Sequence, residues 1–430
     1  MRTIQGARAG GLVAALGLVL VAGAARADVT TERPGSILIF PKVVRDGVRE
    51  TTIQITNTGN MPDTLRCFYL NAQTPAGGQP VCTETDFFLS LTKQQPTQWN
   101  VTTGRAVDPF DADRGLDPGS IPPAPLGFVG ALVCAEVDAS DMPVAQDQLK
   151  GEATLAGVPG SVGQTDISKY NAIAVQGNTT AGANNGDDTL TLNRDATNPG
   201  GEYNACPAAT ILNFEPDGTT DPVIETLGNG GTCNVSGSGC NNDTQCTGTC
   251  NLTTSTCTAG AVGRGCATDA DCGLCVTGQS NVTTTLTVLP CNLDLASNRP
   301  SSVTVQFSIH NELEVQTSVS TTVTCWGSFA LGDVSGAFTA ASILATPFET
   351  ARMVAVSGGP VVSVMETFRT DGAGNRTAAA NNTHTQGVCS AFLNGPTVTT
   401  EPIGCTTDDD CPAPQTCVLT QSAAIRLPPH

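Results

Sequence analysis

The chain has 430 residues, with 39 Asp and Glu residues against 20 Lys and Arg residues and a formal net charge of -19. This balance excludes a nucleic-acid-binding protein, because neutralising phosphates needs clustered Lys and Arg side chains. Apolar residues make up 39% of the sequence and fall in ordered stretches, which excludes a wholly disordered chain. The length predicts roughly two domains.

The first 27 residues have the pattern of a cleaved export signal. Arg2 and Arg8 form a basic start, residues 11–23 are apolar, and Ala25-Arg26-Ala27 has the small-x-small form that a signal peptidase reads. The apolar stretch is too short for the roughly 20 residues that cross a bilayer. We therefore expect a signal peptide at residues 1–27, cleavage before Asp28, and no transmembrane segment. Secretion, the cell surface and the periplasm all stay open as destinations.

Alternation of apolar and polar residues dominates the rest of the chain and predicts β-strands. In chain order, strands are expected at residues 37–40, 52–56, 65–69, 87–91, 128–137, 172–175, 286–288, 302–309, 315–325 and 361–364. Pro41 predicts that the first strand is bulged or at a sheet edge. The turn formers at residues 57–63 are expected to join adjacent strands. Residues 142–153 form the only plausible short helix.

Many short strands separated by turn residues predict a β-sandwich or barrel. We favour an all-β fold, with an immunoglobulin-like framework of one or two sandwiches and disulfide-stapled loop insertions. The framework is expected at residues 34–227 and 280–388. A cysteine-rich insertion with two four-cysteine modules is expected at 228–279, a third module at 389–417, and a C-terminal strand and tail at 418–430.

The 18 cysteines all follow the export signal, and an even number in an exported chain predicts nine disulfides. A C-x2-D-x2-C spacing recurs three times and defines the modules. Their cysteines are Cys233, Cys240, Cys246 and Cys250; Cys257, Cys266, Cys272 and Cys275; and Cys389, Cys405, Cys411 and Cys417. The framework would hold Cys67, Cys82, Cys134, Cys206, Cys291 and Cys325.

We expect cysteines to pair within modules and within the framework, never between them. Cys67 and Cys82 flank a turn-rich segment, and a hairpin there would bring them together. Inside a module we favour first with third and second with fourth, because interleaved links constrain a segment without a core most strongly. Cys272 and Cys275 have the C-x2-C spacing of a zinc site, but no histidine has ligand spacing to them, so we expect disulfides and no metal.

Four aspartates in the modules are candidate calcium ligands, because hard cations bind carboxylate oxygens. They are Asp269, Asp271, Asp408 and Asp410. The alternative is that such aspartates form Asx-turns that shape the short loops. We favour the structural role, since no twelve-residue calcium loop with a closing glutamate is present.

No catalytic motif is found: G-x-S-x-G, H-E-x-x-H and phosphate loops are absent. The three histidines, His310, His384 and His430, lie in a strand end, a loop and the C-terminus. The acid pairs Glu136 with Asp138 and Glu312 with Glu314 are expected to be solvated surface charges. Trp99 and Trp326 are the only tryptophans, and Trp326 is expected in the core. We therefore predict no catalytic residue and no cofactor.

The modules resemble short cysteine-rich repeats of secreted proteins from high-GC environmental bacteria. The framework resembles an uncharacterised secreted family of such bacteria over most of residues 34–330. The segments that carry this resemblance are 36–42, 53–57, 67–72, 86–89, 94–97, 134–138, 169–173 and 302–307. The resemblance implies export and β architecture and brings no activity or catalytic residue with it.

Our leading hypothesis is an exported, non-enzymatic structural or adhesive protein that binds an extracellular protein or a glycan. The first alternative is an extracellular carbohydrate-active or other hydrolytic enzyme. The second is a protease inhibitor, in which the cysteine modules would offer rigid loops.

Overall fold

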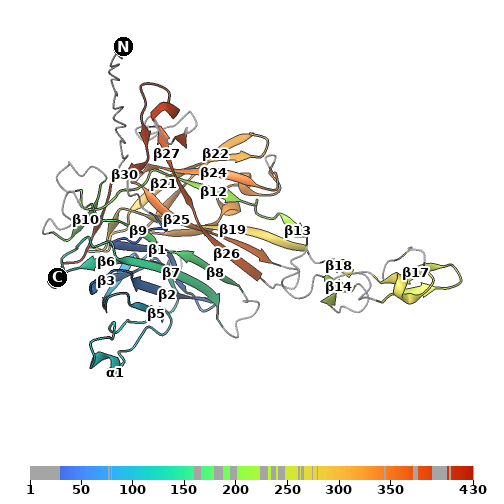
Figure 1. Cartoon of the computed structure of the whole chain (residues 1–430). Helices are drawn as coiled ribbons and strands as arrows, with labels where there is room; N and C mark the ends of the chain where they lie inside the picture. The colour runs from blue at the N-terminus through green and yellow to red at the C-terminus, as the bar shows by residue number, and fades with distance from the viewer. Residues whose placement is uncertain are drawn as a thin grey trace, which may run out of the picture.

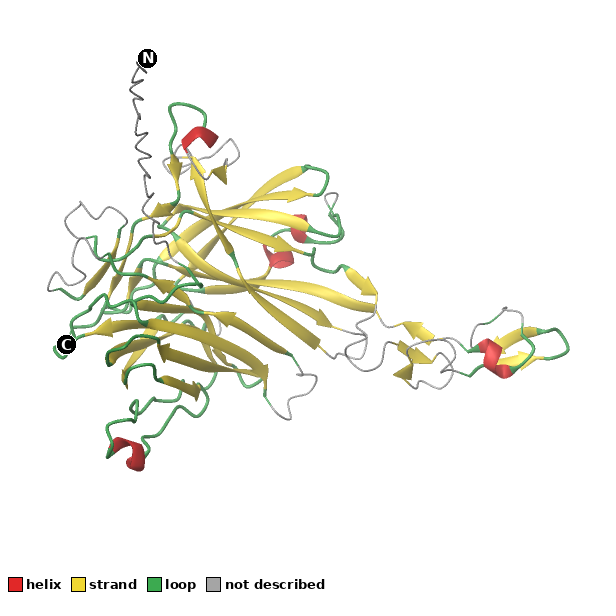
Figure 2. Ribbon diagram, in the orientation of Figure 1, coloured by secondary structure: helices red, strands yellow, loops and turns green. Residues whose placement is uncertain are grey.

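The computed structural model describes residues 30–75, 78, 80–158, 166–178, 187–193, 201–222, 231–233, 239–240, 247–259, 262, 266–273, 275–277, 279–342, 345–370, 376–389, 404–405 and 408–429. The expected export signal lies outside these residues. The described chain is almost entirely strand and loop, as expected for an all-β protein (Figure 2). Its helical turns are α1 (Pro109–Ala112), α2 (Leu331–Val334), η3 (Asp269–Cys272), η4 (Gly336–Phe338) and η6 (Asp408–Asp410). Among the described residues, no helix has the length and apolarity to cross a membrane.

Residues 30–175 form a first β-sandwich. One layer has the order β4-β3-β6-β1-β9 and the other β5-β2-β7-β8. The bounds are β1 (Ile37–Arg45), β2 (Arg49–Asn57), β3 (Asp63–Asn71), β4 (Thr83–Leu91), β5 (Pro96–Asn100), β6 (Phe128–Val137), β7 (Leu149–Gly157), β8 (Ile167–Asn171) and β9 (Ile173–Val175). The two layers are joined at the β1–β2 hairpin, and their facing side chains share one apolar core.

Strand β1 shows how local sequence shapes this sandwich. Both of its faces are buried, because the other side contacts the second half of the chain. Its pairing with β6 shifts register between Phe40 and Val43. Pro41 lies inside that shift and has no N–H to donate to the ladder. The bulge expected from Pro41 is therefore present, in a strand that lies between β6 and β9 and not at the edge of its layer.

Two sequence expectations about the first sandwich are wrong. Residues 57–63 do not join adjacent strands, because β2 pairs with β5 and β7, whereas β3 pairs with β4 and β6. The turn instead crosses from one layer to the other. The short helix expected at residues 142–153 is a loop followed by β7, whose pairing with β2 along its whole length outweighs the local helical pattern.

A second β-sandwich follows. One layer has the order β22-β21-β24-β12-β27, and the facing layer contains β13, β19, β23, β25 and β26. The bounds are β12 (Ala209–Phe214), β13 (Thr220–Pro222), β19 (Gln279–Pro290), β21 (Ser302–Asn311), β22 (Gln316–Thr324), β23 (Gly327–Ala330), β24 (Glu349–Ser357), β25 (Val361–Thr370), β26 (Arg376–Asn382) and β27 (His384–Cys389). A separate apolar core fills the space between the layers. The hairpin expected at 302–325 is confirmed, with unbroken register from Ser302↔Thr324 to His310↔Gln316.

A third apolar cluster joins the sandwiches. It combines the outer face of β1 and β6 with residues of β19 and β25 and of a small sheet, β10-β31-β20. The strands involved are β10 (Thr189–Leu192), β11 (Cys206–Pro207), β20 (Leu293–Asp294), β30 (Thr420–Gln421) and β31 (Ala423–Arg426). The C-terminal strand expected at 418–430 thus returns to the junction of the two sandwiches.

The main cysteine-rich segment leaves the body as an arm (Figure 1). Pro222 of β13 pairs with Gln279 of β19, so the chain departs and returns at neighbouring positions. Along the arm lie β14 (Gly231–Cys233), β15 (Gly239–Cys240), β18 (Cys275–Thr277), β16 (Thr249–Asn251) and β17 (Thr256–Ala259). The third cysteine-rich segment is attached to the end of β27 through β28 (Gly404–Cys405) and β29 (Cys417–Val418).

The framework disulfides are Cys67–Cys134, Cys82–Cys325 and Cys206–Cys291. The expected Cys67–Cys82 pair is therefore wrong. Cys67 lies opposite Cys134 in the β3–β6 ladder, and Cys82 instead joins the first sandwich to the second. The six framework cysteines do pair among themselves.

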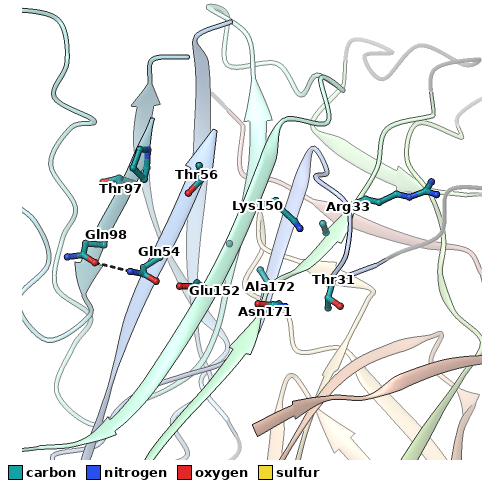
Figure 3. A pocket seen from close by; sticks show the side chains of 13 residues that line it. Thr31, Arg33, Gln54, Thr56, Thr97, Gln98, Lys150, Glu152, Asn171 and Ala172 are labelled. Atoms are coloured by element: carbon teal, nitrogen blue, oxygen red, sulfur yellow. Dashed lines mark hydrogen bonds between the residues drawn. The ribbon is translucent and has the colours of Figure 1, made fainter. Parts of the chain in front are cut away.

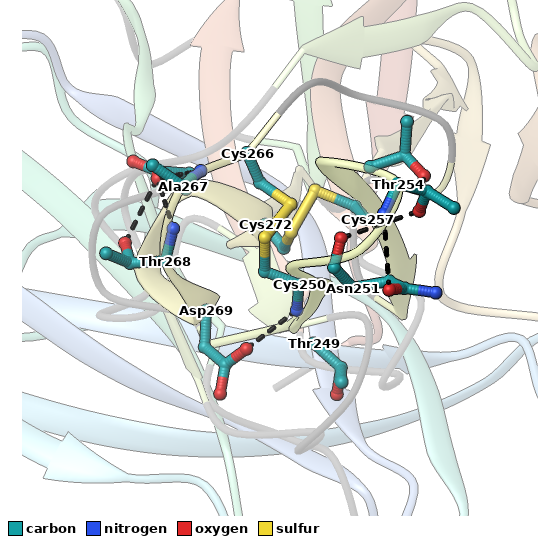
Figure 4. Close-up of a disulfide and its surroundings, with 12 residues drawn as sticks. Thr249, Cys250, Asn251, Thr254, Cys257, Cys266, Ala267, Thr268, Asp269 and Cys272 are labelled. Atoms are coloured by element: carbon teal, nitrogen blue, oxygen red, sulfur yellow. Dashed lines mark hydrogen bonds between the residues drawn. A yellow bond between two sulfur atoms is a disulfide. The ribbon is translucent and has the colours of Figure 1, made fainter.

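In the third module, Cys389–Cys411 and Cys405–Cys417 are the interleaved pairs we expected. In the arm the pairs are Cys250–Cys266 and Cys257–Cys272 (Figure 4). The interleaved pattern is kept, but the expected membership of the two arm modules is wrong, because Cys250 belongs with the later cysteines. The reason is the β16–β17 hairpin, which places Cys250 opposite Cys257. The side chains of Cys233, Cys240, Cys246 and Cys275 lie outside the described residues.

Candidate functional site

A groove of about 600 Å³ lies on the outer face of the β5-β2-β7-β8 layer, beside the N-terminal segment at residues 31–33 (Figure 3). Its lining residues come from five strands and that segment, and most carry amide, hydroxyl or charged groups. They are Thr31, Arg33, Gln54, Thr56, Pro96, Thr97, Gln98, Lys150, Gly151, Glu152, Asn171, Ala172 and Ala174.

Strand alternation explains the polarity of this groove. In β2, Ile53 and Ile55 point into the sandwich core, so Gln54 and Thr56 point outward. Gln54 lies directly opposite Gln98 of β5, and the Gln54 Nε2 group donates to Gln98 Oε1 at 3.0 Å (Figure 3). This bond orients two amides side by side along the groove.

Small residues keep the floor of the groove low. A Cβ atom on Gly151 would lie 2.6 Å from the Phe40 ring, which is closer than packing allows. Ala172 and Ala174 are buried beside it. Larger side chains at these positions would fill the hollow or displace the core beneath it.

Charged groups are placed at the rim. The Lys150 ammonium donates to the Glu32 carbonyl oxygen at 2.9 Å and so ties the N-terminal segment to β7. Glu152 forms an ion pair with Lys169 at 2.6 Å, and both side chains are substantially exposed. Arg33 is exposed. Three basic residues against Glu32 and Glu152 make this rim locally basic on a chain of net charge -19.

A second hollow of about 220 Å³ lies between the two sandwiches, on the other side of the same N-terminal segment. Thr30, Glu32, Ile173, Thr210 and His384 are among its lining residues. Thr30 and Ala174 exchange backbone hydrogen bonds at 3.0 and 2.8 Å. The N-terminal segment therefore forms a wall between both hollows and is held by backbone pairing.

A cluster of buried charges lies where the sandwiches meet. Glu366 of β25 accepts from the Lys42 ammonium at 2.5 Å and from Arg49 Nη2 at 3.0 Å. Asp166 pairs with Arg376 at 2.5 Å. Burial alone would raise the pKa of Glu366, but the charges of Lys42 and Arg49 outweigh burial and lower it to about 2. Since its carboxylates already have cationic partners, the cluster holds the sandwiches in register.

Glu136, expected to be solvated, is fully buried. Its carboxylate accepts from the backbone N–H groups of Gln146, Asp147 and Gln148 at 2.6 to 3.2 Å. Burial raises the pKa of Glu136 to about 8 and that of its neighbour Asp63 to about 6; the charge of Asp63 raises the pKa of Glu136 further, whereas the hydrogen bond with Glu136 lowers that of Asp63. The three N–H donors favour the charged form of Glu136 and so oppose part of the rise that burial causes.

The other acids of those pairs have simpler roles. Asp138 caps a turn by accepting from the N–H groups of Ser140 and Met142. Glu312 and Glu314 are exposed in the β21–β22 turn, as expected. Glu349 is buried, and burial raises its pKa to about 7. Glu136, Asp63 and Glu349 line neither of the two hollows.

The candidate calcium ligands in the arm are used in local structure. Asp269 Oδ1 accepts from the Cys250 N–H at 2.7 Å (Figure 4). Asp271 Oδ2 accepts from the N–H groups of Ala267 and Thr268 at 2.9 and 2.8 Å. Asp408 and Asp410 lie in η6, and the Asp408 side chain is outside the described residues. For Asp269 and Asp271 these bonds fit the structural role that we favoured over calcium binding.

Both tryptophan side chains pack against apolar residues and donate a hydrogen bond. Trp99 is buried and donates from Nε1 to the Tyr69 hydroxyl at 2.6 Å. Trp326 is partly buried, packs against the apolar cluster between the sandwiches, and donates from Nε1 to the Pro41 carbonyl oxygen at 2.7 Å. His310 ends β21, His384 begins β27, and His430 lies outside the described residues.

The comparisons with known proteins leave the class of protein open. No family model and no curated protein matches the sequence. A crystal structure of Thermotoga maritima 1070 is similar over 33% of this chain and 95% of that chain, at 10% identity and a TM-score of 0.21. The crystal structure of tripeptidyl peptidase 2 is similar over 93% of this chain and 28% of that chain, at 9% identity and a TM-score of 0.17. The chain thus spans about a quarter of the length of the peptidase, and these TM-scores carry no functional argument.

Sequence reasoning did not single out the groove residues. The sequence offered one signal for them. In the alternating patterns of β2 and β7, the solvent-facing positions are occupied by Gln54, Thr56, Lys150 and Glu152. That signal is ambiguous, because every half-exposed strand has a polar side. Only the pairing of β2 with both β5 and β7 places these residues in one groove.

Proposed function

We propose that this protein is an exported, non-enzymatic binding protein whose groove holds a segment of glycan carrying acidic groups. The observation that carries the proposal is the lining of the groove, in which amides and hydroxyls lie along the groove and basic groups lie at its rim. Asn, Gln and Thr side chains donate and accept hydrogen bonds, as sugar hydroxyls require. Arg33 and Lys150 supply the charge for a carboxylate or sulfate on the same chain.

The length and openness of the groove support an extended ligand. Most lining residues run across the neighbouring strands β5, β2, β7 and β8, and the Gln54–Gln98 pair presents amides on adjacent strands. Among the residues that the structure describes, no aromatic side chain lines the groove, so affinity per sugar would come from hydrogen bonds and charge. We therefore expect modest affinity that falls as salt is added.

The hydrolytic enzyme is the second candidate, and the geometry favours it less. A glycosidase needs two facing carboxyl groups beside the scissile bond. Glu152 is the only acid whose side chain lines the groove, and Lys169 neutralises it at 2.6 Å. The buried acids with raised pKa values lie inside the sandwiches instead.

The protease-inhibitor hypothesis rests on the disulfide-bracketed tip of the arm. Residues 252–255 form a tight turn, in which Asn251 Oδ1 accepts from the Thr253 N–H at 2.9 Å. Ser255 has a positive φ of 50°. An inhibitor that enters a protease cleft as a strand needs an extended loop, so the turn favours a structural role.

Binding to immobilised and soluble acidic glycans tests the proposal. We expect the wild-type protein to bind, and the double variant Gln54→Ala with Gln98→Ala to lose roughly thirtyfold in affinity, since each of the two net hydrogen bonds contributes about 1 kcal/mol. Arg33→Ala should weaken binding and reduce its salt dependence.

Gln306→Ala is the matched control, because Gln306 is a half-buried glutamine on the outer face of β21 in the other sandwich. It should bind like the wild type. Binding that survives the double variant, or hydrolysis of the glycan by wild-type protein, would contradict the proposal.

A further inference from the structure

Strand β22 is a free edge of the second sandwich, and it has no charged residue. It pairs only with β21, and its sequence, residues 316–324, is QTSVSTTVT. The register with β21 runs over nine residue pairs without a bulge. A long, regular and uncharged edge offers its backbone groups to another strand, and monomeric proteins usually block such edges with charges, proline or bulges.

The other edges in the described part of the chain are blocked in these ways. Strand β4 carries Glu84 and Asp86, and its Ser90 N–H donates to the Pro118 carbonyl oxygen at 2.8 Å. Strand β5 is short and begins with Pro96. Strand β26 carries Arg376 and lies against β8. Compared with these strands, β22 is a long edge strand that no charge, proline or neighbouring strand protects.

The hydrogen-bonding pattern shows which groups of β22 face outward. The Cys325 N–H donates to Ser301 O at 2.7 Å, and the Asn311 N–H donates to Val315 O at 3.1 Å. Bonded pairs alternate along an antiparallel ladder, so the odd-numbered residues of β22 bond to β21. The N–H groups of Gln316, Ser318, Ser320, Thr322 and Thr324 therefore point away from the sheet.

We propose that two copies of this chain pair through β22, antiparallel and about a two-fold axis at Ser320. In this register Ser318 of each copy lies opposite Thr322 of the other, and every outward group lies in a bonding position. Val319 lies opposite Thr321 on the inner face. Hydroxyl and β-branched pairs of this kind stabilise neighbouring strands, and the two sandwiches would share one continuous sheet.

Charge explains why a second copy fits here. Two chains of net charge -19 repel each other over most of their surfaces, whereas β22 brings no charge to the contact. The acids nearest the strand, Glu312 and Glu314, lie in the turn before β22, so antiparallel pairing would place the acids of the two copies at opposite ends of the joint. Leu313 and Val315 at the hairpin turn are 75% and 48% exposed. In the dimer one such turn would lie at each end of the paired strands, and pairing would partly cover these side chains.

The test is the molar mass of the wild-type protein in solution across concentrations up to about 1 mM, at physiological salt, by light scattering after size exclusion and by sedimentation. We expect a monomer–dimer equilibrium. Ser320→Pro removes an outward N–H that β21 does not use, so the fold should persist and the dimer should be lost. Ser320→Lys places two ammonium groups at the axis and should weaken the dimer at least tenfold.

Gln306→Lys is the matched control, because Gln306 lies directly opposite Ser320 on the same face but one strand inward. It should dimerise like the wild type. Hydrogen exchange should also slow in residues 316–324 as concentration rises. A wild-type protein that stays monomeric, or a dimer that Ser320→Pro leaves intact, would overturn the proposal. Slowed exchange at these residues only with another protein bound would overturn self-pairing in favour of a different strand donor.

Discussion

Glu366 illustrates, at the scale of single residues, how charge is handled at the junction of the sandwiches. It is buried, and both of its carboxylate oxygens have cationic partners, at 2.5 Å from Lys42 and 3.0 Å from Arg49. Nothing in the alternating sequence around it distinguishes this glutamate from a solvated one. The partners lie more than 300 residues away in sequence, so only the folded chain identifies the pair.

Glu366→Gln should destabilise the protein by about 3 to 5 kcal/mol, because it leaves the buried charge of Lys42 without its carboxylate partner and Arg49 with only Asp166, at 3.5 Å. Urea unfolding with the disulfides intact measures this change. Glu152→Gln is the control, since its pair with Lys169 is exposed to solvent and should contribute less than about 1 kcal/mol. Equal effects of the two changes would show that the Glu366 cluster contributes no more than a surface pair.

The same glutamate gives the protein a dependence on low pH. Its folded pKa is lowered to about 2 from an ordinary 4.5, so its stabilising effect is complete above pH 4.5 and lost as pH falls through 2. The wild type should lose stability over this window. Glu366→Gln should lose less, and an identical loss would assign the effect to other carboxyls.

Asp63 gives the stability of the protein a pH dependence of the opposite sign. Burial raises its folded pKa to about 6, although the hydrogen bond with Glu136 lowers the pKa in part. An acid with a raised folded pKa destabilises the folded state as pH rises above its ordinary value of 3.8. Asp63→Asn should therefore be nearly neutral at pH 4 and stabilising by roughly 1 to 3 kcal/mol at pH 8, as measured by unfolding at both values. Asp138→Asn, in a nearby turn, should not produce this pH-dependent gain.

At the scale of elements, the disulfides determine which strands and segments of the chain are covalently joined. The interleaved pairing in the third module follows from its short spacing, because few other links constrain a segment without a core. Cys82–Cys325, in contrast, spans 243 residues and joins two sandwiches. Local turn signals pointed to Cys67–Cys82, but the β3–β6 ladder places Cys67 opposite Cys134, and long-range pairing outweighs the local turn.

Replacing both Cys82 and Cys325 with Ala should destabilise the protein by about 2 to 5 kcal/mol. The chain-entropy model gives roughly 5 kcal/mol for so long a loop, and the other framework disulfides already shorten it. Chemical unfolding measures the loss. Replacing Cys405 and Cys417, only 12 residues apart, should affect the third module and leave the main transition in place. A larger loss from the second pair would contradict the assignment of Cys82–Cys325 as the long-range link.

The arm is the main feature at the scale of the whole molecule. It leaves and rejoins the body between Pro222 and Gln279, which are paired neighbours in one sheet (Figure 1). The cores of both sandwiches and the cluster between them draw all their described apolar residues from outside residues 223–278. Folding of the body should therefore not require the arm.

Replacing residues 223–278 with a short Gly-Ser turn should leave the two sandwiches folded. We expect the same β-sheet circular dichroism and a main thermal transition within a few degrees of the wild type. Glycan binding in the groove should also be unchanged, since its lining residues all lie in the first sandwich. Insoluble or unfolded protein would show that the arm contributes to the body.

The sequence by itself determined the all-β class, the bulge at Pro41, the β21–β22 hairpin and the interleaved cysteine pairs of the third module. Each of these depends on neighbours within a few tens of residues, where alternation, proline and spacing act directly. The tertiary structure decided that there are two sandwiches, that Glu136 is buried, that Cys82 bonds Cys325, and that Gln54, Gln98 and Lys150 share a groove. These depend on which strands pair across long separations, and period-two patterns are alike in every strand and cannot specify a partner.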